Sequence, residues 1–154
     1  LISDNSSFVI SGIELKNRSW SDTTGLIQGV TTITSSNEAK KDFNGFQNTQ
    51  SIAEYTHASA AYECTVTQFK NGQMGYLASV GEWMEIINNL DEINKCMSLI
   101  DGLDIDKNAT SYWTSTQYNY EKAWLVTYNG NEIYPNDERK SNPSYAIRVI
   151  SQLK

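Results

Sequence analysis

The sequence predicts an α+β protein in which helices and antiparallel strands occupy separate stretches of the chain. Residues 52–100 carry apolar side chains at helical spacing, whereas residues 112–150 are rich in aromatic and β-branched side chains and contain an Asn-Gly turn signal. The predicted order is a strand, long loops, two helical regions and a run of hairpin-connected strands. With 154 residues the chain can bury a sizeable core, and we expect residues 1–154 to form a single domain.

Composition argues against several classes of protein. Apolar residues make up 39% and charged residues 19% of the chain, as in a folded globular protein. The net charge of −6 argues against a nucleic-acid partner, and no apolar run reaches the 18 residues expected of a membrane-spanning segment. The chain begins at Leu1 with no signal peptide, so we expect it to be the C-terminal part of a longer protein, fused to upstream domains.

The first 50 residues predict one strand and a long loop. The stretch "SSFVISGIELK" at 6–16 has an apolar run followed by alternation, which indicates one strand, or two with a bend at Gly12. Residues 17–50 are rich in Ser, Thr, Asn and Gly. Within them only "GLIQGVTTITSS" has the composition of a further strand, and the rest is predicted to be loop.

The first helical region follows this loop. Its N-cap is predicted to be Asn48 or Thr49, whose side chains can accept a hydrogen bond from a free amide of the first turn. Its apolar face recurs at helical spacing, at Ile52, Tyr55, Ala58 or Ser59, and Tyr62.

The second helical region begins with a capping box. Ser79 and Glu82 have the spacing at which each side chain satisfies a backbone amide of the other residue. An apolar stripe follows at Trp83, Ile86, Ile87 and Leu90. A second short helix is then predicted from Asp91 to about Ile100, ending near Gly102, with inward side chains at Ile93, Met97 and Ile100.

The last third of the chain predicts strands. "YWTSTQY" at 112–118 and "SYAIRVI" at 144–150 are short and rich in strand-forming residues. Between them, "AWLVTY-NG-NEIY" reads as a hairpin, because Asn-Gly suits the positive φ angles of a two-residue turn. Alternation places Trp124, Val126 and Tyr128 on one face of its first strand and Leu125 and Thr127 on the other.

One face of this hairpin must be core, and we expect the opposite face to be open. Together with loops at 118–122 and 134–145 it would present Tyr, Asn, Asp, Lys, Arg and Ser side chains. Tyr beside Ser and Asn is the composition of antibody binding sites, in which rigid aromatic anchors accompany adaptable hydrogen-bonding groups. The alternative is an ordinary solvated sheet face.

No combination of residues predicts catalysis, a cofactor or a metal site. The single His57 has no ligand partner at metal-like spacing, and it lies too far from Cys64 to form a nucleophile-base pair. Cys64 and Cys96 both lie in helix-like segments, so buried thiols are expected, with a disulfide as the alternative. Residues 104–108 resemble half of a calcium loop, but the Gly and Glu expected later in that loop are missing, which favours a polar loop over a calcium site at 101–108.

Five separated blocks, in order, resemble one known family. They are "KDFNGFQNTQSIAE", "AAYECTVTQFKNGQMGYL", "GYLASVGEWMEIINNLDEI", "YWTSTQYNYEKAWLVTYNGNEIY" and "YAIRVI". The sequence is similar to bacterial C-type lectin-like domains of the formylglycine-generating-enzyme subtype, and among these to the variable proteins of diversity-generating retroelements. The resemblance covers most of residues 8–150 and implies a C-type lectin-like fold used as a display scaffold.

The resemblance also implies which residues bind. Trp113, Trp124 and Arg148 match framework positions of the family. The positions that match its diversified, ligand-binding residues are Asn119, Tyr120, Glu121, Lys122, Leu125, Thr127, Tyr134, Asn136, Asp137, Asn142, Ser144 and Tyr145. The paired active-site cysteines of formylglycine-generating enzymes and the calcium-sugar motifs of animal C-type lectins have no counterpart here, so neither activity is expected.

Two functional hypotheses follow. The first is a non-enzymatic recognition domain whose residues 118–145 are diversified to bind a protein or glycan on another cell or surface, with Tyr120, Tyr134 and Tyr145 as anchors. The second is a structural or static adhesin module of a larger surface or phage tail protein, without diversification. Under either hypothesis the resemblance implies a cell-surface, secreted or virion-associated location.

Overall fold

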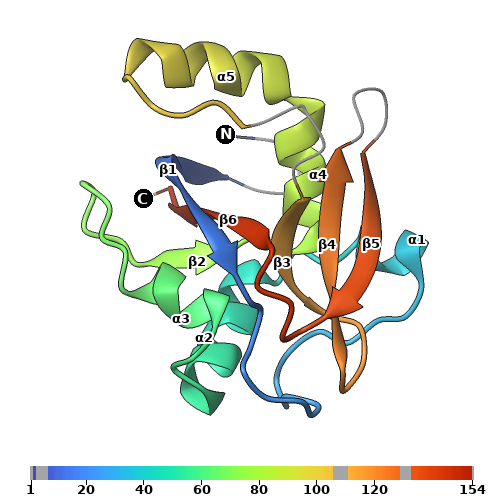
Figure 1. The fold of residues 1–154 in the computed structure, drawn as a ribbon. Helices are drawn as coiled ribbons and strands as arrows, with labels where there is room; N and C mark the ends of the chain where they lie inside the picture. The colour runs from blue at the N-terminus through green and yellow to red at the C-terminus, as the bar shows by residue number, and fades with distance from the viewer. Residues whose placement is uncertain (1, 3–6, 106–110, 129–132, 154) are drawn as a thin grey trace.

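The computed structural model describes residues 2, 7–105, 111–128 and 133–153. Five helices and six strands form within these residues, which confirms the α+β class (Figure 1). In chain order they are β1 (Phe8–Arg18), α1 (Ser36–Ala39), α2 (Gly45–Tyr55), α3 (Ala60–Thr65), β2 (Gly75–Leu77), α4 (Val80–Asn88), α5 (Leu90–Leu99), β3 (Ser111–Gln117), β4 (Lys122–Tyr128), β5 (Ile133–Arg139) and β6 (Tyr145–Gln152).

The sheet is mixed, so the prediction of an antiparallel sheet was wrong at one pair. The strand order is β1-β6-β3-β4-β5, and β2 pairs with β6. Strands β3 and β6 run parallel, with Tyr112 opposite Ala146, whereas the other paired strands are antiparallel. After β5 the chain doubles back before β6 begins, so β6 enters beside β3 in the same direction (Figure 1).

The strands at the two edges differ in regularity. β1 is one strand whose pairing with β6 shifts register between Ile10 and Glu14, around the predicted bend at Gly12. β5 pairs regularly with β4 from Ile133 to Arg139, so its residues are not the loop that was predicted for 134–145. Pro135 is compatible with this strand because β5 lies at the edge of the sheet, where a residue without an amide hydrogen need not break the backbone hydrogen bonds to a neighbouring strand.

The first helical region is two helices, not one. α2 ends at Tyr55 because Thr56 is extended, and α3 begins after Ser59, whose Oγ accepts the Tyr62 amide at 3.1 Å. The N-cap of α2 is Asn44, earlier than predicted. Thr49 instead lies buried inside the helix, where its Oγ1 accepts the Leu77 amide at 2.9 Å and ties α2 to β2. Asn48 is buried beside it.

The second helical region matches the prediction except at its end. Ser79 and Glu82 form the capping box, with Glu82 Oε2 accepting the Ser79 amide at 2.8 Å. Trp83, Ile86 and Leu90 are buried, and Ile93 and Met97 of α5 join them. Ile100 was predicted to face inward, but it is 66% exposed because α5 ends at Leu99 and the chain turns at Asp101, where φ is +52°.

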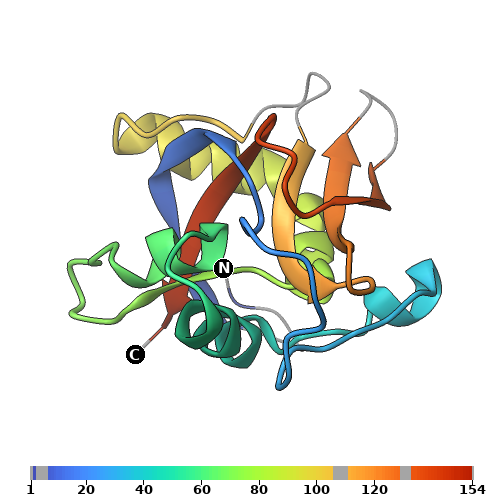
Figure 2. The same cartoon turned by 60° about the horizontal axis from the view of Figure 1, so that its bottom comes forward.

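Helices cover both faces of the sheet, as the two views show (Figures 1 and 2). On one face, Tyr112 and Val126 pack against Trp83 of α4 and the inward side of α5. On the other, Trp113 and Leu125 pack in a second cluster with residues of α2, α3 and the segment 20–30. The expectation that one face of the hairpin would be open is therefore wrong for most of β4.

The segment at 25–36 does not form the further strand. Thr32 makes one isolated bridge to Gln117, and the side chain of Gln117 accepts the Ile27 amide at 3.1 Å. The backbone of this segment is thus satisfied by a few isolated backbone bonds, such as Ile33 N to the Gln117 carbonyl, and by side chains, rather than by a strand ladder. Cys64 is buried in α3 and Cys96 is exposed on α5, and both are free thiols. None of the helices in the described residues is both long and apolar enough to span a membrane.

Candidate binding face

A group of polar and aromatic side chains shares one side of β3, β4, β5 and the start of β6. The register places Thr127 opposite both Ser111 and Tyr134, and Asn136 two residues further along β5, on the same face as Tyr134. Facing pairs on neighbouring strands point to the same side of a sheet. We call this set the binding face: Ser111, Thr127, Tyr134, Asn136, Glu138, Ser144 and Tyr145.

Tyr145 is the most firmly held member of the binding face. Its ring meets Trp113 edge-on at 5.4 Å between centroids, and its hydroxyl donates to Glu138 Oε2 at 2.9 Å. Burial and the neighbouring Glu138 carboxylate raise the pKa of Tyr145, so the phenol stays protonated at neutral pH. The half-buried ring is therefore held in place from two sides.

Tyr134 and Asn136 project further out. Tyr134 is 40% exposed and Asn136 is exposed on the edge strand β5, opposite Thr127 and Leu125 respectively. Leu125 itself is only 1% exposed and packs in the core with Trp113, so it cannot contact a ligand and is removed from the predicted set. Alternation along the strand predicted on which face Leu125 lies, but it could not predict that distant parts of the chain cover that face.

Lys122 and Asp137 lie on the opposite side of the hairpin. Their side chains form an ion pair at 2.6 Å, and Lys122 Nζ lies 6.0 Å from the centroid of the Tyr118 ring. The hydrogen bond that Lys122 donates to the Asp137 carboxylate raises the pKa of Lys122. The structure therefore does not bring these two predicted residues to the binding face.

The asparagines at 119 and 142 support turns. Asn119 Oδ1 accepts the amides of Glu121 and Lys122, both at 2.8 Å, and leaves Tyr120 and Glu121 exposed at the tip between β3 and β4. Asn142 Oδ1 accepts the Ser144 amide at 3.0 Å. Of the twelve predicted positions, those brought together on the binding face are Thr127, Tyr134, Asn136, Ser144 and Tyr145.

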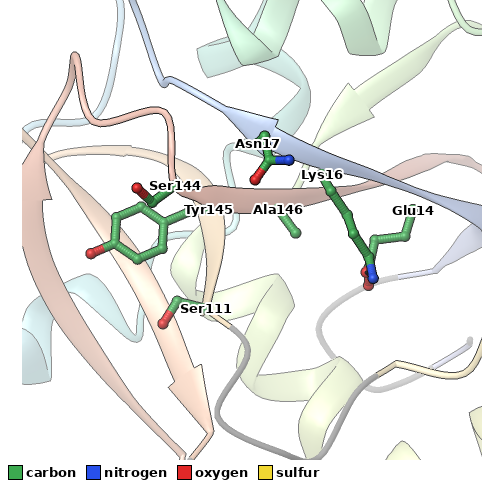
Figure 3. A pocket seen from close by; sticks show the side chains of 7 residues that line it. All are labelled: Glu14, Lys16, Asn17, Ser111, Ser144, Tyr145 and Ala146. Carbon is green, nitrogen blue, oxygen red and sulfur yellow. Dashed lines mark ion pairs between the residues drawn. The ribbon is translucent and has the colours of Figure 1, made fainter.

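A polar hollow opens beside the binding face (Figure 3). Its volume is about 270 Å³, and we call it the Glu14 pocket. Its lining residues come from the end of β1, the start of β3 and the start of β6: Glu14, Lys16, Asn17, Ser111, Ser144, Tyr145 and Ala146. Ser111, Ser144 and Tyr145 belong to both the pocket and the binding face, so the two form one continuous surface.

Sequence reasoning missed the β1 side of this pocket. Glu14, Lys16 and Asn17 lie in a stretch predicted only as strand and loop, far along the chain from β6. The pairing of β1 with β6, in which Glu14 is opposite Arg148, brings them to Tyr145. Asn17 has a φ of +56°, a conformation that asparagine tolerates better than most residues, but this alone would not have marked a site.

Hydrogen bonds from Tyr112 and Arg148 hold the Glu14 side chain in place. Its Oε1 accepts the Tyr112 hydroxyl at 2.5 Å and Arg148 Nη2 at 3.2 Å, while Oε2 lies 3.9 Å from Lys16 Nζ. The Arg148 guanidinium is fully buried and also donates to the backbone carbonyls of Ser11, Leu103 and Asp104. A buried ion pair of this kind positions its members more than it stabilises the fold.

No group of three His, Cys, Asp or Glu side chains that could hold a metal ion occurs in the described part of the chain. The half calcium motif at 104–108 falls largely on residues 106–108, which are outside the described residues. The predicted Asn-Gly turn at 129–130 is also outside them. The flanking strands β4 and β5 pair as an antiparallel hairpin, but with Tyr128 opposite Ile133, which leaves four residues between them rather than the predicted two.

Comparison with known proteins shows a similar fold. No family model matches the sequence, and no curated protein matches it. A fimbrial protein from Bacteroides ovatus has a similar structure, with a TM-score of 0.67 and 19% sequence identity over 95% of this chain. The likeness covers 35% of the fimbrial protein, so this chain spans about a third of its length.

Proposed function

We propose that this chain is a recognition module of the adhesin type, carried by a larger cell-surface protein, which binds its ligand on the binding face. The observation that carries the proposal is the binding face itself: tyrosine, asparagine and serine side chains, fixed by a buried aromatic framework, beside a polar pocket. The likeness to part of a fimbrial protein supports the cell-surface location over the secreted and virion-associated alternatives.

The finer fold proposed is that of a C-type lectin-like domain. In support, the resembling sequence blocks coincide with β2, the capped helix α4, the strands β3 to β5 and the closing strand β6. The residues matched to the family framework, Trp113, Trp124 and Arg148, are all buried. A crystal structure that superposes on C-type lectin-like domains through all six strands would establish this assignment.

A non-enzymatic role is part of the proposal. Cys64 would be the nucleophile of any thiol chemistry, but its side chain is fully buried, and burial raises its pKa far above neutral. Thiol-dependent oxidation of a peptide that is lost on Cys64→Ser would contradict this part of the proposal.

Substitution of Tyr134 tests the recognition role. We expect Tyr134→Ala to weaken binding of the fluorescently labelled domain to intact cells and to immobilised mucin by about tenfold, because a tyrosine anchor at an interface commonly contributes a kcal/mol or more. Tyr55→Ala is the matched control, since Tyr55 is 52% exposed on α2, away from the binding face.

Both variants should have the same urea unfolding midpoint as the wild-type protein. Equal binding by the Tyr134→Ala and Tyr55→Ala proteins would exclude the binding face as the contact surface. Tyr145 is not used in this test because it packs on Trp113, so its removal would also perturb the core.

A diversified display domain is the second candidate. The observation in its favour is that, of the twelve predicted positions, only Leu125 is buried and only Tyr145 of the others packs on the core, so the remaining ten can vary at little cost to the core. The test is genetic. A nearby near-copy of the 3′ coding region that differs only at adenines would support diversification, and its absence from the locus would leave a static adhesin.

A further inference from the structure

We infer that the Glu14 pocket is a metal-independent site for one neutral sugar residue. The inference deepens the proposed recognition function and rests on it, since it names the ligand class of the concave part of the same surface. It assigns ligand contacts to Glu14, Asn17 and Ser111, which lie outside the stretch 118–145 that sequence reasoning singled out.

The lining of the pocket matches the chemistry of a sugar ring. Apart from Ala146, every lining side chain carries a hydrogen-bonding group, and these include acceptors, donors and hydroxyls that do both. The hydroxyls of a sugar each donate and accept, so a mixed set of this kind can pair with several at once. A volume of about 270 Å³ is at the small end for ligand pockets, which suits a single ring.

The floor of the pocket holds an acceptor in place. Glu14 is almost fully buried, and its Oε1 is occupied by Tyr112 and Arg148. Its Oε2 makes only the long 3.9 Å contact with Lys16 among the described residues. That oxygen can therefore accept hydrogen bonds from a ligand hydroxyl, and charged acceptors make the stronger hydrogen bonds.

One wall is a fixed aromatic ring. Tyr145 is held by Trp113 and by its hydrogen bond to Glu138, and Figure 3 shows it across the hollow from Asn17 and beside Ser144. A rigid tyrosine offers an apolar surface at little cost in conformational entropy. The C–H face of a sugar ring can pack on such a surface while its hydroxyl rim meets the polar residues.

Charge argues against other ligands. A phosphate or carboxylate needs several free cationic donors. Arg148 is fully buried and does not line the pocket, and Lys16, which is 72% exposed at the rim, is the only cationic side chain among the lining residues. A divalent cation needs several oxygen ligands with negative charge, and the lining supplies one carboxylate. A lipid chain needs an apolar lining, which this pocket does not have.

The test is an NMR titration of the 15N-labelled domain with galactose, glucose, mannose, N-acetylglucosamine and fucose, each up to about 20 mM, in the presence of EDTA. Sialic acid and inorganic phosphate serve as charged probes. We expect at least one neutral sugar to give saturable amide shifts centred on Asn17, Ser111, Ser144 and Tyr145.

Two substitutions locate the site. Asn17→Gly removes the side-chain amide while allowing the positive φ angle at residue 17. Ser144→Leu places a bulky apolar side chain at the exposed mouth of the pocket. Each should weaken the sugar response about tenfold without lowering stability, as expected for the loss of one or two hydrogen bonds. Tyr55→Ala is the control: Tyr55 is exposed on α2 and belongs to neither the pocket lining nor the binding face, so its substitution should leave the sugar response unchanged.

The outcomes separate this inference from the proposed function. If no neutral sugar shifts the pocket amides, or only sialic acid or phosphate does, the inference is overturned, whereas the effect of Tyr134→Ala on cell binding is unaffected. A response that EDTA abolishes would overturn the metal-independent part. A sugar response that survives both Asn17→Gly and Ser144→Leu places the site elsewhere and also overturns the inference.

Discussion

At the scale of single residues, Glu82 is the most unusual group in the fold. Its carboxylate is buried at the start of α4, where Oε2 accepts the amide and hydroxyl of Ser79 and Oε1 accepts the Tyr76 hydroxyl at 3.3 Å. Burial raises its pKa to about 7, and the hydrogen bonds from Ser79 and Tyr76 only partly offset that rise. A residue that the sequence marked as a simple helix cap is thus a titrating group in the core.

This raised pKa predicts a pH dependence of stability. Because the folded state binds the Glu82 proton more tightly than the unfolded state, the stabilisation is complete below the unfolded pKa of about 4.5 and is lost as pH rises through about 7. Between these values we expect the unfolding free energy to fall by an amount on the order of 3 kcal/mol. Urea denaturation at a series of pH values measures this change in the free energy of unfolding.

Glu82→Gln removes the charge and should flatten that part of the profile, while Glu54→Gln, on the exposed side of α2, should leave the wild-type slope. A wild-type protein whose stability is constant between pH 5 and 8, or a Glu82→Gln protein with an unchanged slope, would contradict the assignment.

At the scale of elements, the start of α2 approaches the start of α4 too closely for a side chain at residue 45. Gly45 opens α2 directly against the capping box of α4, and a Cβ at that position would lie 2.0 Å from Glu82 Oε2 and 2.9 Å from the Ser79 nitrogen. The start of α4 is also held toward α2, because the Gly81 amide donates a hydrogen bond to the Asp42 carbonyl at 2.9 Å. The two helix starts can therefore meet only if residue 45 has no side chain.

We therefore expect Gly45→Ala to destabilise the protein by about 2–3 kcal/mol, as overpacking of a core does. The matched control is Gly72→Asn, because Gly72 has no neighbouring atom within 4 Å of a Cβ and asparagine tolerates its φ of +76°. Urea midpoints compare the two variants. If both shift equally, the helix junction is not the constraint that the geometry indicates.

At the scale of the whole molecule, Lys140 ties three separate parts of the chain together. Lys140 is only 1% exposed. Its Nζ donates hydrogen bonds to the backbone carbonyl oxygen of Gly25 and to the side-chain oxygen Oε1 of Gln117, both at 2.6 Å. The same Nζ lies 4.8 Å from the centre of the Trp20 ring. Burial lowers its pKa to about 8, whereas the two carbonyl oxygens and the ring favour the charged form. The long segment at 20–30 is held against the sheet through this contact.

Lys140→Met should destabilise the protein by about 2–4 kcal/mol, because the Gly25 carbonyl loses its side-chain donor and Gln117 Oε1 keeps only the Ile27 amide. It should also expose the segment at 20–30 to limited proteolysis. Lys70→Met, at an exposed lysine, is the control. An unchanged urea midpoint and an unchanged proteolytic pattern would show that the segment is held by its apolar contacts alone.

Much of the fold was predictable because its signals are local. The capping box, the apolar stripe of α4 and the strands β3, β4 and β6 depend on residues within a few positions of each other, and all lie where the sequence placed them. The break between α2 and α3 was not predictable from periodicity, because the helical spacing continues past Thr56 while Ser59 caps a new helix.

The sequence by itself determined the α+β class, the capping box of α4 and which residues alternate together along each strand, since these follow from backbone and side-chain preferences over short distances. Only the tertiary structure decided that β6 runs parallel to β3, that Leu125 is buried, and that Glu14 meets Tyr145. The physical reason is that alternation states which side chains share a face, whereas exposure depends on the distant segments that pack on that face.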